Sequence, residues 1–229
     1  MMRPELSLLT PIFEEEQGLA RALPLLLDAA ESMTERFELL IVDDGSRDAG
    51  PKRVESLARR DARVRLVRHG RNLGPGAALP TGMFWARGDW VLFVPADLAC
   101  EPEDLIRMWR ARADADLVVG LRSDRRDYGW GRKALSYAYI GIVRLLSGSK
   151  VRQFNYLQMV RRSLFERLPL HARGVFVTAE IILGAERLGA RIEEVPLRYV
   201  PRLDGVARGA SPRAMARCAW ELARHFLVG

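Results

Sequence analysis

Carboxylates stand directly after two apolar runs of the sequence, where they could bind a nucleotide or a metal ion. Asp43 and Asp44 follow the run Leu39 to Val42, and Asp97 closely follows the run Trp90 to Val94. A carboxylate at a strand end can accept a hydrogen bond from a base or ribose, or hold a divalent cation against a diphosphate. Asp44 and Asp97 are therefore the best candidates for chemistry. For Asp44 a plainer alternative stays open, because Asp-Gly-Ser also makes turns and caps helices without any ligand.

A loop rich in glycine supplies a second possible anion site. The segment 72–78, Asn-Leu-Gly-Pro-Gly-Ala-Ala, enters a predicted helix whose free N–H groups could face a phosphate. It does not match the dinucleotide fingerprint G-x-G-x-x-G after the first strand, and the sequence has no Walker A motif. These absences disfavour a Rossmann dehydrogenase and a P-loop NTPase.

Other polar residues give weaker signals. The basic segment from Arg122 to Lys133 fits either a phosphate-facing loop or a solvated surface segment. His69, His171 and His225 are isolated from one another and form no recognisable catalytic constellation, so we assign them no role. Cys100 and Cys218 have no neighbouring ligands at metal-site spacing, which predicts ordinary thiols.

Composition narrows the protein class without naming a partner. The 229 residues are 48% hydrophobic and carry a formal net charge of +7, mostly from arginine. This charge fits a nucleoside diphosphate, a lipid phosphate, an anionic membrane or nucleic acid, although genome base composition also produces arginine-rich proteins. Nucleic acid is disfavoured because no nucleic-acid-binding motif accompanies the charge. Without a signal peptide or a long apolar run, we expect a cytoplasmic protein or one attached peripherally to the inner face of the membrane.

The candidate residues need a scaffold, and the first half of the sequence alternates short apolar runs with amphipathic stretches. This pattern predicts βαβ units and a mostly parallel sheet flanked by helices, an α/β fold. The predicted strands are 6–10, 39–42, 64–67, 90–94 and 117–119, and the predicted helices between them are 15–31, 52–60, 77–86 and 103–113. Ligands of such sheets bind at the carboxyl ends of the strands, where the carboxylates stand.

The alternation weakens beyond about residue 120. We expect apolar or periodic helices around 135–146 and 176–188, and a strand over 194–200. Ser211-Pro212 is a good helix start, and Met215, Cys218, Leu222 and Phe226 share one face of the helix that follows. The sequence therefore predicts a terminal amphipathic helix that could dock on a membrane, pack on the core or form a dimer.

Read in order, these segments resemble family 2 glycosyltransferases of the group that includes the dolichyl-phosphate mannosyltransferases. The segment 8–16, LLTPIFEEE, resembles the family opening V-P-x-Y-N-E-E, and 41–48, IVDDGSRD, closely matches I-V-D-D-G-S-x-D. The segments 72–78, 81–82 and 86–89 follow its glycine-loop, T-G and A-x-G-D landmarks, and 95–98, PADL, falls where D-A-D-L belongs. Downstream, 118–122 resembles V-x-G-S-R, 194–196 matches E-V-P, and Arg202 with Gly205 fits R-x-x-G.

The resemblance implies a single GT-A domain over 1–229. It would comprise a nucleotide-sugar-binding half at 1–120, an acceptor-side half at 121–210 and the terminal helix at 211–229. It further implies an inverting transferase that moves a sugar from a nucleoside-diphosphate donor to a polyprenyl phosphate or another membrane-associated acceptor, with Mg²⁺ or Mn²⁺ as cofactor. The implied catalytic residues are Asp97, which would also hold the metal, and Arg202. The implied substrate-binding residues are Pro11, Phe13, Glu15, Asp43, Asp44, Gly76, Arg122 and Gln153.

Several positions depart from the family pattern. Glu14 replaces the usual Asn, Pro75 the glycine-loop Lys, Pro95 the first carboxylate of D-A-D, and Gln153 stands where an Asp is common. Fewer carboxylate ligands and fewer cations should weaken the binding of a metal–diphosphate pair. An alternative therefore stays open: a non-catalytic binding or partner subunit that keeps the GT-A scaffold with a degraded metal site.

Overall fold

The computed structural model describes residues 3–96, 98, 100–122, 130–198 and 212–227. Its strands are β1 (Leu6–Ile12), β2 (Phe37–Asp43), β3 (Val64–Arg68), β4 (Trp90–Phe93), β5 (Leu117–Arg122), β6 (Gln158–Arg161) and β7 (Ile192–Leu197). Its helices are α1 (Glu16–Met33), α2 (Gly50–Ala58), α3 (Pro75–Trp85), α4 (Pro102–Ala111), α5 (Trp130–Ser147), α6 (Arg162–Phe165), α7 (Val177–Arg187) and α8 (Pro212–Leu227), with a 3₁₀ turn at Arg112–Asp114.

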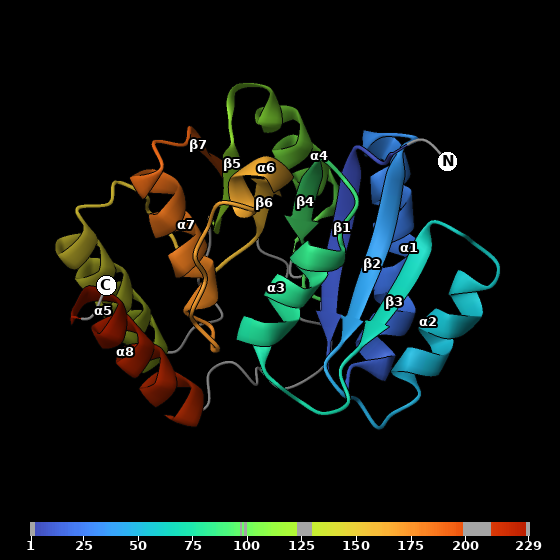
Figure 1. Ribbon diagram of the computed structural model, residues 1–229, viewed down its shortest axis with the longest axis horizontal. Helices are drawn as coiled ribbons and strands as arrows, with labels where there is room; N and C mark the ends of the chain where they lie inside the picture. Colours follow the sequence, from blue (N-terminus) through green and yellow to red (C-terminus); the bar gives the residue numbers. More distant parts are fainter. Residues whose placement is uncertain (1–2, 97, 99, 123–129, 199–211, 228–229) are drawn as a thin grey trace.

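The described strands form one sheet in the order β3-β2-β1-β4-β6-β5-β7 (Figure 1). All neighbours pair in parallel except β6, which runs antiparallel to β4 and β5. The β1–β2 register places Leu6 opposite Phe37 and Ile12 opposite Asp43. The α/β prediction of a mostly parallel sheet is confirmed, whereas β6 is a strand that the sequence did not predict.

Helices cover both faces of the sheet and create two cores. One core contains Leu8, Leu39 and Leu92 with the inner faces of α1 and α4. The other contains Leu9, Leu40 and Val91 with α3 and α7. Successive residues of a strand point to opposite faces, so strands buried on both sides read as the continuous apolar runs seen in the sequence.

Two helices lie together at the flank of the sheet, beyond α7 (Figure 1). Val143 of α5 and Cys218 and Leu222 of α8 belong to the same core cluster, and Tyr139 of α5 packs against it. Among the described residues, none of the helices combines the length and the hydropathy that crossing a bilayer requires.

Candidate functional site

The carboxyl ends of the parallel strands meet along one edge of the sheet, at the lower side of Figure 1. The end of β1 and the first residue after β2 are joined directly, because the Asp44 N–H donates to the Ile12 carbonyl at 2.9 Å. The next strand joins them, since the His69 N–H donates to the Asp43 carbonyl at 2.8 Å. Segments far apart in the sequence therefore converge where ligands of such sheets bind.

Asp43 is buried and fixes the turn that follows β2. One carboxylate oxygen accepts the Ser46 N–H at 2.9 Å, and the other accepts Nε of Arg68 at 3.0 Å. Its side chain is 0% exposed. A carboxylate in this position shapes the loop, and the paired arginine offsets the cost of burying its charge.

Asp44 organises the glycine loop. Its Oδ1 accepts the Leu73 N–H at 2.9 Å and lies 2.7 Å from Nδ1 of His69, while its Oδ2 accepts the Gly74 N–H at 2.8 Å. Gly74 has a φ of 88°, which a residue with a side chain adopts only at a cost. Each carboxylate oxygen has two acceptor positions, so Oδ2 keeps one beyond the Gly74 bond among the contacts described.

Asp44 does not cap the next helix: its carboxylate accepts N–H groups of the glycine loop, and Asp43 makes the turn by accepting the Ser46 N–H. Asp48 accepts the N–H groups of the first residues of both helices, Gly50 at 3.1 Å and Glu16 at 2.9 Å. The starts of α1 and α2 are thereby tied to one carboxylate. Asp44 remains directed at the glycine loop.

Gly76 lies against a second loop, residues 170–175. A Cβ built on Gly76 would stand 2.1–2.5 Å from the backbone of Arg173, so only glycine allows this approach. Two buried glutamates hold the second loop: Glu180 of α7 accepts the N–H groups of His171 and Ala172, and Glu221 of α8 accepts those of Arg173 and Gly174. The glycine loop is thus supported from α8.

The loop after β1 lies beside these residues. Pro11 is the next-to-last residue of β1, Phe13 directly follows the strand, and Glu15 directly precedes α1. Glu14 adopts a φ of 54°; its N–H donates to Ser46 Oγ at 3.0 Å, and its carboxylate accepts the Arg47 N–H at 2.8 Å. The acidic segment after β1 is therefore pinned to the loop after β2.

Arg122 and Gln153 are brought together as neighbours. The Arg122 N–H, at the end of β5, donates to Oε1 of Gln153 at 2.9 Å. Gln153 is 8% exposed and precedes β6, whose amino end lies on the same edge as the carboxyl end of β5. The neutral amide of Gln153 thus gives the N–H at the end of β5 a hydrogen-bond partner without adding a charge.

The described residues do not provide a complete site for a divalent cation. They contain no group of three or more His, Cys, Asp or Glu side chains able to hold a metal ion. Asp43 and Asp44 already accept internal hydrogen bonds, and Pro95 has no carboxylate. Asp97 and Arg202, the expected catalytic residues, lie outside the described residues.

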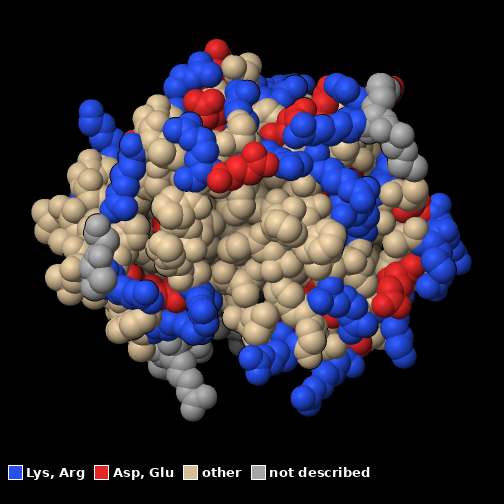
Figure 2. Space-filling model, in the orientation of Figure 1, with Lys and Arg blue, Asp and Glu red and all other residues tan. Residues whose placement is uncertain are grey.

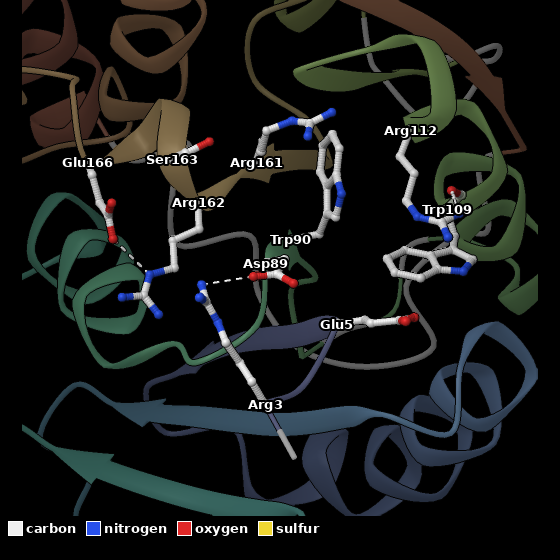
Figure 3. Close-up of a pocket in the computed structure, with 10 residues that line it drawn as sticks. All are labelled: Arg3, Glu5, Asp89, Trp90, Trp109, Arg112, Arg161, Arg162, Ser163 and Glu166. Carbon is white, nitrogen blue, oxygen red and sulfur yellow. Dashed lines mark hydrogen bonds and ion pairs between the residues drawn. The ribbon is translucent and has the colours of Figure 1, made fainter.

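A cavity of about 580 Å³ lies at the opposite edge of the sheet, where β1 and β4 begin (Figure 3). Lys and Arg side chains gather along this upper edge in Figure 2. Arg3 pairs with Asp89 at 2.8 Å, Arg162 with Glu166 at 2.9 Å, and Arg112 stacks 3.5 Å above Trp109. Because internal partners engage these guanidinium groups, the cavity is a weaker ligand site than the strand-end edge.

Sequence reasoning missed two residues of the strand-end site. His69 contacts Asp44 and also lies 3.0 Å from Thr81 Oγ1 through Nε2. Its signal was its position directly after β3, the strand next to β2. Glu221 gave no comparable signal, because its two N–H partners lie nearly fifty residues earlier.

Comparison with known proteins points to one family. The family model described as Glycosyl transferase family 2 matches residues 7–169. The dodecaprenyl-phosphate galacturonate synthase of Rhizobium johnstonii is 33% identical over 208 residues, which cover 89% of this chain and 61% of the relative. The undecaprenyl-phosphate 4-deoxy-4-formamido-L-arabinose transferase of Pseudomonas paraeruginosa is 33% identical over 215 residues, covering 91% and 61%. The chain thus spans about three fifths of the length of these relatives.

Solved structures agree on the fold. Glucosyl-3-phosphoglycerate synthase from Mycobacterium tuberculosis, solved with Mn²⁺, UDP and phosphoglyceric acid, superposes with a TM-score of 0.74 at 20% identity, covering 97% of this chain and 78% of that one. The same enzyme with Mg²⁺ and UDP gives a TM-score of 0.73, covering 97% and 79%. The predicted GT-A fold is confirmed.

Proposed function

Because the chain belongs to glycosyl transferase family 2, we propose that it transfers a sugar, with inversion, from a nucleoside-diphosphate donor to a polyprenyl phosphate or another membrane-associated acceptor. Two relatives support the acceptor class, since their names specify dodecaprenyl phosphate and undecaprenyl phosphate. This acceptor needs no general base, because a phosphate oxygen is already an anion at neutral pH.

The glycine loop beside Asp44 carries the donor half of this proposal. Asp44 holds the N–H groups of Leu73 and Gly74, and the loop leads directly into α3. The amino end of a helix presents free N–H groups and a partial positive charge, which favour a diphosphate. The remaining acceptor position of Asp44 Oδ2 suits a donor group on the nucleotide. The residues proposed to surround the donor are Pro11, Phe13, Glu15, Asp43, Asp44 and Gly76.

The transfer itself is a displacement at the anomeric carbon of the sugar. A phosphate oxygen of the acceptor forms the new bond from the face opposite the diphosphate, and the carbon–oxygen bond to the diphosphate breaks. The nucleoside diphosphate leaves with the electron pair of the broken bond. No proton has to be removed, because the attacking phosphate oxygen is already an anion. We place Asp97 at the diphosphate, with Mg²⁺ or Mn²⁺ as its proposed partner, and Arg122, Gln153 and Arg202 near the phosphates.

One observation favours a second candidate, a non-catalytic nucleotide-binding subunit. Pro95 occupies the first carboxylate position of the metal motif, and the described residues contain no metal-ligand cluster. A protein of this kind would keep the donor pocket and lose the chemistry.

Calorimetric titration with UDP, GDP and their sugar conjugates, with and without Mn²⁺, separates these candidates. A transferase should bind one nucleotide with metal dependence and should glycosylate a polyprenyl phosphate. Asp97→Ala should abolish transfer while leaving the fold intact, and Asp114→Ala, at an exposed carboxylate away from the strand-end site, should be neutral. Nucleotide binding without transfer to any polyprenyl phosphate would favour the second candidate, and full turnover by Asp97→Ala would remove Asp97 from the mechanism.

A further inference from the structure

The outer face of α5 is apolar although it faces solvent. Its large exposed side chains include Trp130, Leu135, Ile142, Leu145 and Leu146, of which Leu145 is 84% and Trp130 91% exposed. At 100° per residue these positions fall on one side of the helix, together with exposed Gly131, Ala134, Ala138 and Gly141. This arc contains no charged residue. A soluble surface helix normally places its polar residues there.

The neighbouring helix α8 repeats this arrangement. Its exposed face carries Trp220, which is 60% exposed, and Leu227, which is 83% exposed, together with exposed Ala216, Ala219 and Ala223 on the same side of the helix. Because Tyr139 and Cys218 pack in the same core on the buried sides of α5 and α8, the two outer faces flank the same part of the molecule. We call these exposed apolar residues of α5 and α8 the flank surface.

The exposed charged side chains described at the border of the flank surface are positive. The exposed cations Arg144, Arg217 and Arg224 lie beside the apolar arcs. Arg217 also pairs with Glu221 at 3.6 Å, and Arg224 stacks 5.6 Å above the ring of Trp220, itself part of the flank surface. The sequence of α5 contains no Asp or Glu, and the one acidic residue of α8, Glu221, is buried against the loop at Arg173. Figure 2 shows mainly uncharged side chains over α5, at the left of the view. The described part of this flank therefore complements an anionic partner.

We propose that the flank surface binds an anionic lipid bilayer. Apolar side chains enter the boundary between headgroups and acyl chains, and bordering arginines are attracted to anionic headgroups. Exposed Trp and Tyr side chains suit this partner, because amphipathic rings concentrate at membrane interfaces; Trp130, Tyr137 and Trp220 supply them. The described helices are too short or too polar to span the bilayer, so the surface lies on it.

The position of the flank surface suits the proposed acceptor, and in this respect the inference rests on the proposed function. The chain of α8 begins at the lower side of Figure 1, where the strands β1 to β3 also end. A bilayer on the flank surface would bring a lipid-borne phosphate toward the strand-end edge. The binding itself requires no nucleotide and no turnover.

Co-sedimentation with vesicles tests the inference. The 229-residue chain should bind vesicles that contain equal amounts of phosphatidylglycerol and phosphatidylcholine. It should bind vesicles of phosphatidylcholine alone more weakly, and salt should weaken the binding to the anionic vesicles. Leu145→Glu and Trp220→Glu should each lower the binding by about tenfold, because each places a carboxylate in the interface. Phe84→Glu is the matched control, since Phe84 is 80% exposed but belongs to α3.

Absence of vesicle binding by the unsubstituted chain would overturn the inference, as would equal losses in Phe84→Glu and Leu145→Glu. A dimer that dissociates in Leu145→Glu by sedimentation velocity would assign the surface to a second copy and overturn it as well. Titration of the same variants with nucleotide in solution keeps the two proposals apart. Vesicle binding without nucleotide binding contradicts the donor proposal alone.

Discussion

Glu221 of α8 holds Gly174 in place beside the glycine loop. Its Oε2 accepts the Gly174 N–H at 3.2 Å, and its Oε1 accepts the Arg173 N–H at 2.9 Å. The backbone of Arg173 in turn touches Gly76. A buried carboxylate on the terminal helix therefore connects the flank of the molecule with the proposed donor pocket.

Glu221→Gln should loosen this connection. An amide offers a single acceptor oxygen, so one buried N–H loses its partner, at a cost of about 1–3 kcal/mol in the free energy of unfolding. We expect faster hydrogen exchange at Arg173 and Gly174 and weaker nucleotide binding. Arg224→Gln, an exposed change on the same helix, is the control. Unchanged exchange at both amides in Glu221→Gln would show that the carboxylate does not position the loop.

Cys218 provides a second readout of the docking of α8. The thiol is buried, and burial raises its pKa to about 11, so it should react slowly with alkylating reagents at pH 8. If Glu221→Gln loosens α8, alkylation of Cys218 should accelerate, as followed by mass spectrometry of its peptide. Cys100, which is buried in the other core, should keep its rate. Acceleration at both cysteines would instead indicate global unfolding.

Gly76→Ala should disrupt the contact between the two loops. The added methyl group would meet the Arg173 backbone at 2.1–2.5 Å, and relief requires one loop to move. We expect a loss of about 1–3 kcal/mol in the free energy of unfolding, as for overpacking elsewhere, together with weaker nucleotide binding. Gly70→Ala is the matched control, because a Cβ at Gly70 meets nothing within 4 Å. Similar denaturation midpoints for the two variants would contradict the close approach.

Much of the scaffold was predictable because its strands are buried on both faces. Leu39 to Val42 is a continuous apolar run, and β2 lies between two neighbours in the sheet. The strand β6 was missed because Gln158–Arg161 is short and polar at both ends. Its pairing with β4 and β5, far away in the sequence, makes it a strand, and tertiary context of this kind overrides local pattern.

The candidate site was predictable only in part. Asp44 stands out because it follows an apolar run, whereas His69 becomes its partner through the β2–β3 register, which pairs Asp43 with Arg68. Isolated histidines in a sequence cannot reveal that alignment before the strand order is known. Glu221 depends on where α8 docks, which its amphipathic pattern leaves open.

Glu14→Asn should stabilise the protein. Glu14 has a φ of 54°, a left-handed conformation that Asn tolerates better than Glu does. We expect a gain of about 0.5–1 kcal/mol in the free energy of unfolding, reduced by whatever part of the hydrogen bond from the Arg47 N–H is lost. Chemical denaturation measures it. Glu35→Asn, at an exposed position without positive φ, should give no gain, and destabilisation by Glu14→Asn would mean that the bond to Arg47 dominates.

His225 should make the docking of α8 sensitive to acid. Burial, and then the neighbouring Arg187 guanidinium, lower the pKa of His225 below its ordinary value of 6.5. Arg187 lies 3.0 Å from Nε2 of His225, a contact that needs an unprotonated nitrogen, while Glu180 lies 3.9 Å from Nδ1 and favours the charged form more weakly.

The direction of the pH effect follows from these contacts. The unfolded chain takes up a proton near pH 6.5, whereas the folded chain resists it until a lower pH. The contribution of His225 to stability is therefore complete above about pH 6.5 and declines as the pH falls toward the lowered folded value. Alkylation of Cys218 at its peptide and denaturation midpoints, compared at pH 7.5 and 5.5, measure this decline. His225→Gln should flatten it, whereas His171→Gln, which removes a smaller contribution to the lowered pKa of His225, should change it less. An equal decline in His225→Gln would assign the acid sensitivity to other groups.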